Sequence, residues 1–230
     1  MLLPFRKNAT KFYMLKAENI KKKYGSLEVL KGISLEVKKG EIISIVGASG
    51  AGKSTLLHIL GTLDKPDEGN LWMNDTLLSS LNGNALSKFR NEEIGFVFQF
   101  HNLLPEFTAF ENICMPGMIG QKSIDNLEKR AMELMQLLRI DHRKDHKPAE
   151  MSGGEQQRAS VARALINNPA IIFADEPSGN LDSSNADELH ELFFKLREEL
   201  EQTFVIVTHN NAFAQMADRL IEIKDGMMKV

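Results

Sequence analysis

Cysteine, tryptophan and tyrosine are scarce in this sequence, and long hydrophobic runs are missing. The 230 residues include one cysteine, one tryptophan and two tyrosines. Because Cys114 is the only cysteine, an internal disulfide is excluded, and we interpret it as a small apolar side chain in a reducing compartment. Apolar runs such as residues 42–48 fall far short of the roughly 20 residues that span a bilayer. We therefore expect a globular protein that does not itself cross a membrane.

A strong excess of charge is also missing. The formal net charge is -3, which gives no basis for a nucleic-acid-binding surface, so we expect no nucleic acid partner. The only tight basic run, residues 21–23, is typical of a solvated strand end or loop.

The first residues do not have the pattern of a targeting segment. The apolar start at residues 1–4 is too short for a signal peptide, and its basic residues follow on the wrong side. Met14 starts a cleaner strand pattern. We therefore expect residues 14–230 to form a single domain. Residues 1–13 are expected to be an N-terminal extension or to result from an upstream start codon.

The segment around Lys53 matches the phosphate-binding loop, G-x-x-x-x-G-K-S/T, at every fixed position. This phosphate loop consists of Gly47, Ala48, Ser49, Gly50, Ala51, Gly52, Lys53 and Ser54. The apolar run 42–46 before it predicts a strand, and residues 54–60 after it predict a helix. Glycines let the backbone N–H groups turn toward an anion, and a helix start adds about half a positive charge.

A nucleoside triphosphate site follows from this motif. Lys53 is expected to reach the β- and γ-phosphates, and Ser54 is expected to bind Mg²⁺. Thr55, the next helical residue, is counted among the nucleotide-binding residues.

Three further apolar runs end in polar residues. Residues 94–98 are followed by Gln99, residues 171–174 by Asp175 and Glu176, and residues 203–207 by a threonine and His209. Ligands of open α/β sheets bind at the carboxyl ends of strands, so these side chains are expected to face the phosphate loop. Asp175 is a candidate for holding Mg²⁺ through water, and Glu176 for orienting or deprotonating the attacking water. A lone glutamine or histidine is usually structural, so Gln99 and His209 depend on their surroundings.

A second helix start with anion-binding character lies at Ser152, Gly153 and Gly154. Apolar residues at helical spacing follow it, the serine hydroxyl suits an N-cap, and the glycines leave backbone N–H groups accessible. Taken alone, this segment is an ordinary N-cap. Residues 106–139 also show helical spacing without an intervening strand, which predicts a helical insertion into an α/β core.

Two other patterns are weaker. Tyr24 lies in a turn between two strands predicted at residues 15–20 and 29–37, where its ring is a candidate for stacking on a purine base. His142 and His146 are four residues apart, which on a helix is compatible with a metal pair. Neighbouring basic residues and Pro148 make that interpretation the less favoured one.

In their order along the chain, these segments resemble those of an ATP-binding cassette ATPase. The resemblance covers nearly everything from Met14, and its most specific element is the Ser-Gly-Gly signature before a helix. It implies an α/β fold: a phosphate-loop NTPase-like core with an antiparallel β subdomain and a helical subdomain at about residues 100–165.

The resemblance also implies roles for the candidate residues. Two copies are expected to pair head to tail as a homodimer that encloses two ATP molecules. The residues expected to face the γ-phosphate in one copy are Lys53, Ser54, Gln99, Asp175, Glu176 and His209. Of these, Ser54, Gln99 and Asp175 are assigned to Mg²⁺. Ser152 and Gly154 of the other copy are expected to contact the phosphate, with Gly153 between them. Tyr24 matches the adenine-stacking aromatic, and Asp182 matches the acid that links the two sites.

This sequence departs from the family pattern at three positions. Met151 stands where leucine is preferred, which is a near-isosteric change. Glu155 replaces the commoner glutamine, which we do not treat as inactivating, and Asn210 follows His209 where aspartate is frequent.

Within the family, local segments resemble the ATPase subunits of lipoprotein-releasing systems. They are residues 98–109, Met115-Pro116, residues 59–64, His142-Arg143 with His146, and residues 178–182, the last of which the macrolide-efflux-type ATPases share. This subgroup implies an ATP-hydrolysing transport subunit at the cytoplasmic face of the inner membrane, with transmembrane permease subunits docking near Gln99 to Pro116. The alternative is an ATPase of a macrolide-efflux-type mechanotransmitting transporter. Less favoured are a soluble cassette ATPase acting on nucleic acid or ribosomes, and a nucleotide sensor that does not hydrolyse ATP.

Overall fold

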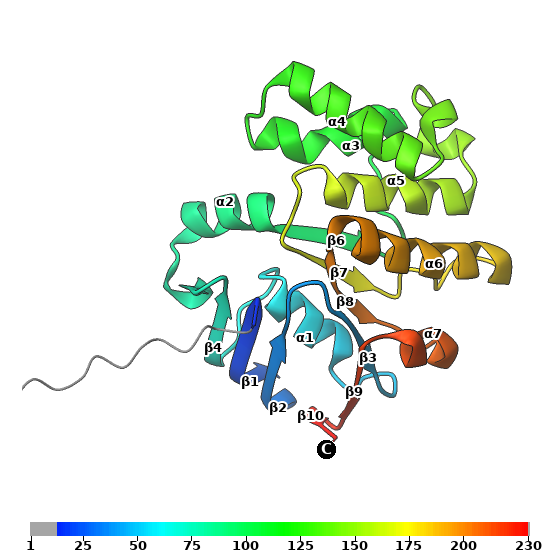
Figure 1. Ribbon diagram of the computed structural model, residues 1–230. Coiled ribbons are helices and arrows are strands. Elements are labelled where there is room, and N and C mark those ends of the chain that lie inside the picture. The colour runs from blue at the N-terminus through cyan, green and yellow to red at the C-terminus, as the bar shows by residue number, and fades with distance from the viewer. Residues whose placement is uncertain (1–12, 230) are drawn as a thin grey trace, which may run out of the picture.

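Two β-sheets organise the computed structural model, which describes residues 13–229 (Figure 1). The larger sheet has six strands in the order β10-β9-β3-β8-β7-β6, and all of its pairings are parallel except that of β9 with β10. Its strands are β3 (Ile42–Val46), β6 (Ile94–Phe98), β7 (Ile171–Asp175), β8 (Thr203–Val207), β9 (Arg219–Lys224) and β10 (Met227–Met228). The central strands are continuous apolar runs because helices cover both faces of a parallel sheet.

The smaller sheet is antiparallel and has the order β2-β1-β4-β5. Its strands are β1 (Leu15–Tyr24), β2 (Leu27–Val37), β4 (Glu68–Met73) and β5 (Thr76–Leu77). Buried and more exposed residues largely alternate along β1, as the period-two pattern predicts. The strands predicted at residues 15–20 and 29–37 are confirmed as parts of β1 and β2, which pair antiparallel.

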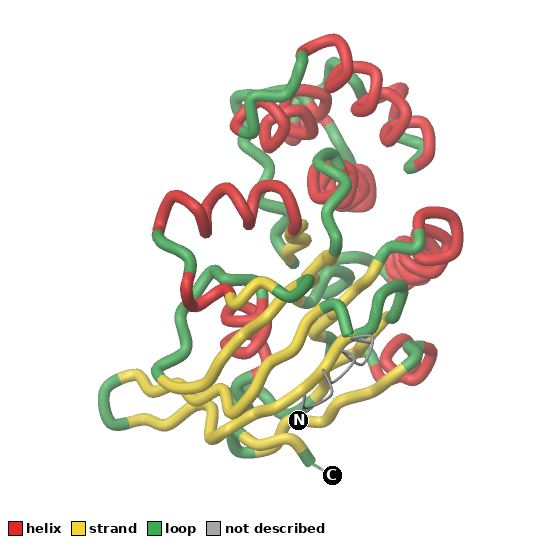
Figure 2. The backbone as a smooth tube through the Cα atoms, turned by 60° about the vertical axis from the view of Figure 1, so that its left-hand side comes forward, coloured by secondary structure: helices red, strands yellow, loops and turns green. Residues whose placement is uncertain are grey.

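Seven α-helices and three short 3₁₀ turns are present among the described residues. The helices are α1 (Lys53–Leu60), α2 (Gly83–Glu93), α3 (Ala109–Ile119), α4 (Ile124–Leu137), α5 (Gly153–Leu165), α6 (Ser183–Leu200) and α7 (Asn211–Met216). The 3₁₀ turns are η1 (Leu78–Ser80), η2 (Asp141–Arg143) and η3 (Pro148–Glu150). Helices α3, α4 and α5 lie between β6 and β7 in the chain. The predicted insertion of helices into the α/β core is therefore confirmed. Figure 2 shows these helices on one side of the long strands.

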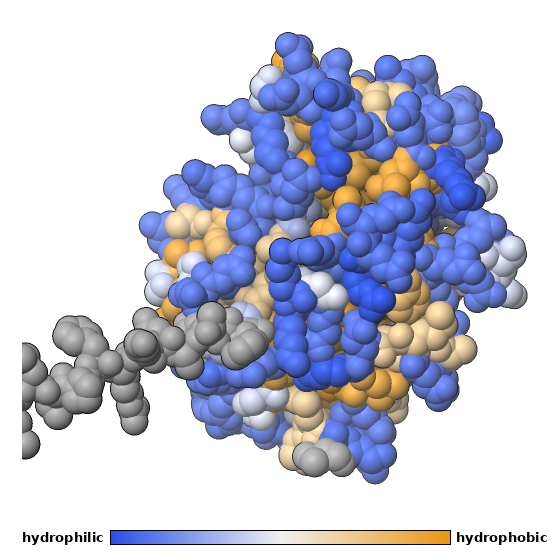
Figure 3. Space-filling model, in the orientation of Figure 1, coloured by the Kyte–Doolittle hydropathy of each residue, from blue (hydrophilic) through white to orange (hydrophobic). Residues whose placement is uncertain are grey.

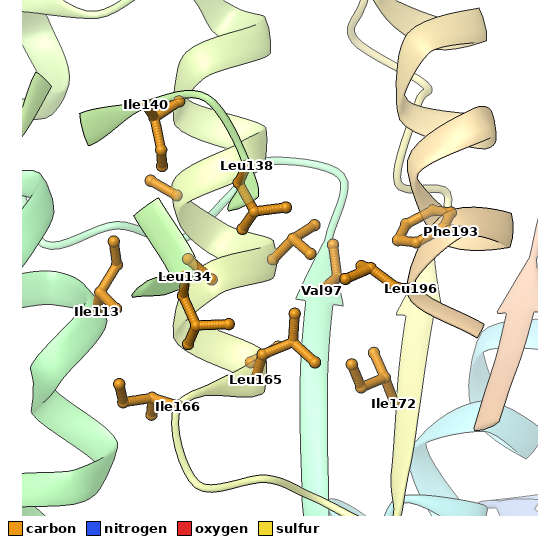
Figure 4. Packing of buried hydrophobic residues seen from close by; sticks show 14 of the residues in the cluster. Val97, Ile113, Leu134, Leu138, Ile140, Leu165, Ile166, Ile172, Phe193 and Leu196 are labelled. Carbon is orange, nitrogen blue, oxygen red and sulfur yellow. The ribbon is translucent and has the colours of Figure 1, made fainter. Parts of the chain in front are cut away.

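The hydrophobic core is divided into two clusters of buried residues. One cluster joins α1 to the antiparallel sheet and to part of the larger sheet. The other contains Leu134 of α4, Leu165 of α5, Val97 of β6 and Phe193 of α6 (Figure 4). In that cluster α5 lies between the outer helices and the sheet. The inserted helices therefore share a core with the sheet and are positioned by it.

The surface facing the viewer in Figure 3 is mostly hydrophilic, with hydrophobic residues gathered in the region of helices α3 to α6. In the described part of the chain, every helix is too short or too polar to span a bilayer.

Candidate nucleotide-binding site

The phosphate loop leaves the buried strand β3 and enters α1. Its backbone needs glycine at both ends: Gly47 has a φ of +151° and Gly52 has a φ of +101°. A Cβ at Gly47 would collide with the carbonyl of Ile223, and one at Gly52 would lie 2.8 Å from Leu30 Cδ2. Residues 48–50 at the tip are exposed. The loop therefore has a close-packed base and a backbone that is accessible at its tip.

The start of α1 has the charge distribution that a phosphate group needs. Lys53 Nζ donates to Gly47 O at 2.9 Å and to Ala48 O at 3.1 Å, so its ammonium lies against the loop. The first turn of α1 contains no acidic residue, and no side chain caps it. The helix dipole and the lysine charge therefore act on an anion at this position, and the first turn of the helix adds no carboxylate of its own.

Ser54 and Asp175 bring two oxygen atoms together beside the loop. Ser54 Oγ donates to Asp175 Oδ1 at 3.0 Å, although the residues are far apart in the sequence. A hydroxyl and a carboxylate are oxygen ligands of the kind Mg²⁺ prefers, so the donor set fits this ion. His58, one helical turn after Ser54, lies 3.6 Å from Asp175 Oδ2. His58 is not among the site residues predicted from the sequence, although its i+4 spacing from Ser54 places both on one face of α1.

Glu176 and His209 form the second close pair at this edge. Glu176 Oε2 accepts a hydrogen bond from His209 N at 3.0 Å, and His209 Nδ1 lies 2.7 Å from the same oxygen. Glu176 has a φ of +47°, a left-handed conformation that costs a non-glycine residue about 1–3 kcal/mol. Its backbone N–H donates to Val207 O, which fixes this turn against β8. The carboxylate is thus held at the strand ends, while the histidine side chain is 71% exposed.

Gln99 reaches the same sheet edge but contacts a different loop. Its Nε2 donates to Asn180 Oδ1 at 3.0 Å, and Asn180 Nδ2 donates back to Gln99 O at 3.0 Å. This reciprocal amide pair directs the glutamine toward residues 178–182. Its proposed contact with Mg²⁺ is not part of this arrangement and stays a prediction.

The loop after Gln99 is attached to α5 by side chains that the sequence analysis did not select. Arg163 donates to His101 O at 2.7 Å and to Asn102 O at 2.6 Å. Gln157 is buried, and its Oε1 contacts His101 Nδ1. These contacts join distant segments, and no local pattern indicates them. They connect the end of β6 to α5.

Ser152 caps α5 as predicted, and it forms a capping box with Glu155. Its hydroxyl accepts from Glu155 N at 3.3 Å, while Glu155 Oε2 accepts from Ser152 N at 2.8 Å. Gly154 is buried against α6, where a Cβ would lie 2.5 Å from Asn185 Oδ1. Asn185 Nδ2 donates to Asp182 Oδ2 at 2.7 Å. Asn185, absent from our predictions, therefore connects the Ser-Gly-Gly segment to Asp182.

Glu155 is also held by η2. Arg143 Nε donates to Glu155 Oε1 at 2.8 Å, and His142 Nε2 lies 3.3 Å from that oxygen. Burial alone would raise the pKa of the Glu155 carboxyl, but hydrogen bonds from Arg143, Ser152 and His142 outweigh it and lower the pKa to about 2. His142, considered above for a metal pair, therefore contacts this carboxylate.

Tyr24 lies at the end of β1. Its hydroxyl donates to Asp64 Oδ2 at 2.6 Å, and Lys22 Nζ lies 5.2 Å from its ring centroid. The ring is about half exposed, at 52%, which leaves aromatic surface accessible to solvent. The hydrogen bond to Asp64 is the largest cause of a raised pKa of the phenol, and Thr55 at the start of α1 also interacts with it.

Comparison with known proteins identifies the class that this fold and loop define. The family model described as ABC transporter matches residues 30–179. The chain belongs to this family and is an ATP-binding cassette ATPase. The expected fold class and family resemblance are confirmed.

Among the relatives are proteins named lipoprotein-releasing system ATP-binding protein LolD. The protein from Cytophaga hutchinsonii is 59% identical over 215 residues, which cover 94% of this chain and 98% of that protein. The protein from Bacteroides thetaiotaomicron is 56% identical over 216 residues, covering 94% and 99%. A solved dimeric structure of a post-hydrolysis state of an ATP-binding cassette, bound to ADP and Pi, has a TM-score of 0.86 and 41% identity. The match covers 94% of this chain and 97% of the chain in that structure.

Proposed function

We propose that this chain is the ATP-hydrolysing subunit of an inner-membrane transporter that releases lipoproteins toward the outer membrane. The observation that carries the proposal is the similarity to LolD proteins over nearly the full length of both chains. It extends beyond the phosphate loop, which many unrelated ATPases share. The roles proposed for individual residues in ATP hydrolysis rest on the contacts of Ser54 with Asp175 and of Glu176 with His209.

In this proposal, Lys53 and the backbone of the phosphate loop hold the β- and γ-phosphates of ATP. Ser54 and Asp175 hold Mg²⁺, with Gln99 as a third ligand, and the ion neutralises charge on the phosphates when bound. The Glu176 carboxylate accepts a proton from the attacking water and orients it. His209 contacts the γ-phosphate, and Tyr24 stacks on the adenine. The convergence of Ser54 with Asp175 and of Glu176 with His209 supports these roles.

A second copy of the chain completes the site in this proposal. Ser152, Gly153 and Gly154 of one copy contact the γ-phosphate bound by the other, and Asp182 connects the two sites. Ser152 and Gly153 are exposed in the single chain, which leaves them accessible to a partner copy. ATP then stabilises the closed homodimer because it binds that state more tightly than the open one. Loss of the γ-phosphate reopens the dimer.

The membrane partner is proposed to be a pair of permease subunits that dock near Gln99 to Pro116. Exposed apolar side chains, including Phe100 at 74% and Ile119 at 69%, lie in or beside this segment. A groove of about 340 Å³ lies next to it, lined by residues of α2, β6, α3 and α5 that include Phe98 and Pro116. A cytoplasmic loop of a permease subunit is the proposed occupant of this groove, and its binding would hold this chain at the cytoplasmic face of the inner membrane.

Reconstitution with the co-purifying permease tests the proposal. Proteoliposomes that contain the complex and a labelled lipoprotein should release the lipoprotein with ATP, and Glu176→Gln should stop the release. Efflux of a macrolide with no effect on the lipoprotein would instead indicate the alternative transporter class. The proposal would be contradicted if the protein purified without any membrane protein and if its deletion left lipoprotein sorting intact.

A further inference from the structure

The two helix starts assigned to phosphate differ in charge. The first turn of α1 contains no acidic residue, whereas the first turn of α5 contains Glu155. A carboxylate at a helix start stabilises the helix, but it also repels a second anion placed there. Without compensation, Glu155 would oppose the contact between Ser152 and a phosphate group.

Compensation comes from the segment between α4 and α5. Arg143 Nε donates to Glu155 Oε1 at 2.8 Å, while Glu155 Oε2 turns back to Ser152 N at 2.8 Å. The Glu155 side chain is 19% exposed and that of Arg143 is 32% exposed. The carboxylate is therefore partly shielded from water, and its charge is screened less than that of a fully exposed pair.

Backbone hydrogen bonds fix the segment that carries Arg143. Arg143 N donates to Ile140 O at 2.9 Å, and Ala109 N at the start of α3 donates to His146 O at 2.8 Å. These hydrogen bonds hold the turn that carries Arg143. The position of its guanidinium relative to α5 is therefore fixed by the fold of the helical region.

We propose that Arg143 is a positioning residue that neutralises Glu155, so that the start of α5 accepts the phosphate of ATP held by the partner copy. The inference rests on the proposed function, because the phosphate belongs to a second subunit. Arg143 acts through Glu155 and does not need to touch the nucleotide. Replacing only the arginine removes the permanent positive charge beside the carboxylate and leaves it with its contacts to Ser152 N and His142 Nε2. Replacing both residues removes the negative charge and the need for its arginine partner.

Nucleotide-dependent dimerisation of the full chain tests this inference. In a Glu176→Gln background, analytical ultracentrifugation gives the ATP concentration at which half of the chains are dimeric. Arg143→Gln should raise this concentration about tenfold, which corresponds to about 1.4 kcal/mol. Glu155→Gln should leave it equal or lower it. The double variant Arg143→Gln/Glu155→Gln should return to within about twofold of the parent.

Three controls separate charge from damage to the fold. Arg143→Lys keeps the positive charge and should stay within about threefold of the parent. Arg139→Gln removes an exposed arginine from the same connection and should have no effect. Binding of a fluorescent ADP analogue to the monomer should be equal in all variants, because the phosphate loop is unchanged. If Arg143→Gln fails this control, Arg143→Met takes its place in the single and the double variant.

The outcomes are distinguishable. If the double variant is as impaired as Arg143→Gln, or if Arg143→Gln dimerises like the parent, neutralisation of Glu155 is not the role of Arg143. Failure of the parent Glu176→Gln protein to dimerise with ATP would contradict the proposed function itself.

Discussion

Gly154 and Gly153 are adjacent in the signature segment, yet the structure predicts opposite responses when each is replaced by alanine. A Cβ at Gly154 would lie 2.5 Å from Asn185 Oδ1 and 3.0 Å from Asn185 Cγ. A Cβ at Gly153 would meet only Leu181 Cδ2, at an ordinary contact distance of 3.7 Å. The two variants make the same chemical change one residue apart, so they control for each other.

The magnitudes follow from overpacking and helix propensity. Overpacking a close contact costs about 1–3 kcal/mol, and glycine to alanine in a helix gains about 0.5–1 kcal/mol. The difference of the two terms is a loss of up to about 2.5 kcal/mol for Gly154→Ala, whereas Gly153→Ala should gain up to about 1 kcal/mol. In a domain of this size each kcal/mol shifts the melting temperature by about 2–4 °C. Gly154→Ala should melt up to about 10 °C lower than the parent.

Differential scanning calorimetry of the nucleotide-free chain measures both shifts. Equal melting temperatures for the two variants would refute the close packing of Gly154 on α6.

Three further predictions concern single side chains. Glu176→Gln should lower kcat by about 10²–10⁴-fold while ATP still induces dimers, and retained turnover in a phosphate-release assay would rule out its role as the base. Lys53→Ala should weaken ATP binding itself in isothermal titration, whereas unchanged affinity would count against the loop assignment. The pKa of Glu155 is lowered from 4.5 to about 2, so its charge stabilises the fold above pH 4.5 and this contribution is lost as the pH falls toward 2. Glu155→Gln should therefore flatten the pH dependence of the melting temperature in this window, and an unchanged slope between pH 4.5 and 2 would contradict the contacts of Glu155.

The local parts of the site could be predicted because short patterns determine them. The phosphate loop needs only a strand, glycines and a helix in sequence, and Ser152 caps the helix that its motif predicts. The position of Asp175 beside Ser54, and of Glu176 at the end of the same strand, follows from a general rule for parallel sheets. These inferences required no knowledge of which strands are neighbours.

The contacts that hold these parts together could not be predicted. Asn180 pairs with Gln99, Asn185 packs on Gly154, and Arg163 binds the carbonyls after β6, all across long separations in the sequence. Asparagine and arginine are common surface residues, so composition gives them no special weight. Their roles depend on the strand order and on how α5 packs against the sheet, which only the folded chain defines.

The central claim is that a second copy completes the nucleotide site, and thiol cross-linking tests it most directly. Ser49 and Ser152 are exposed, so cysteines placed there react with a short bismaleimide. Cys114 is buried, and burial raises its pKa to about 11, which keeps the native thiol unreactive. In a Glu176→Gln background, the Ser49→Cys/Ser152→Cys chain should form covalent dimers with ATP and not with ADP, and neither single variant should do so. Equal cross-linking with both nucleotides, or none with ATP, would contradict the account.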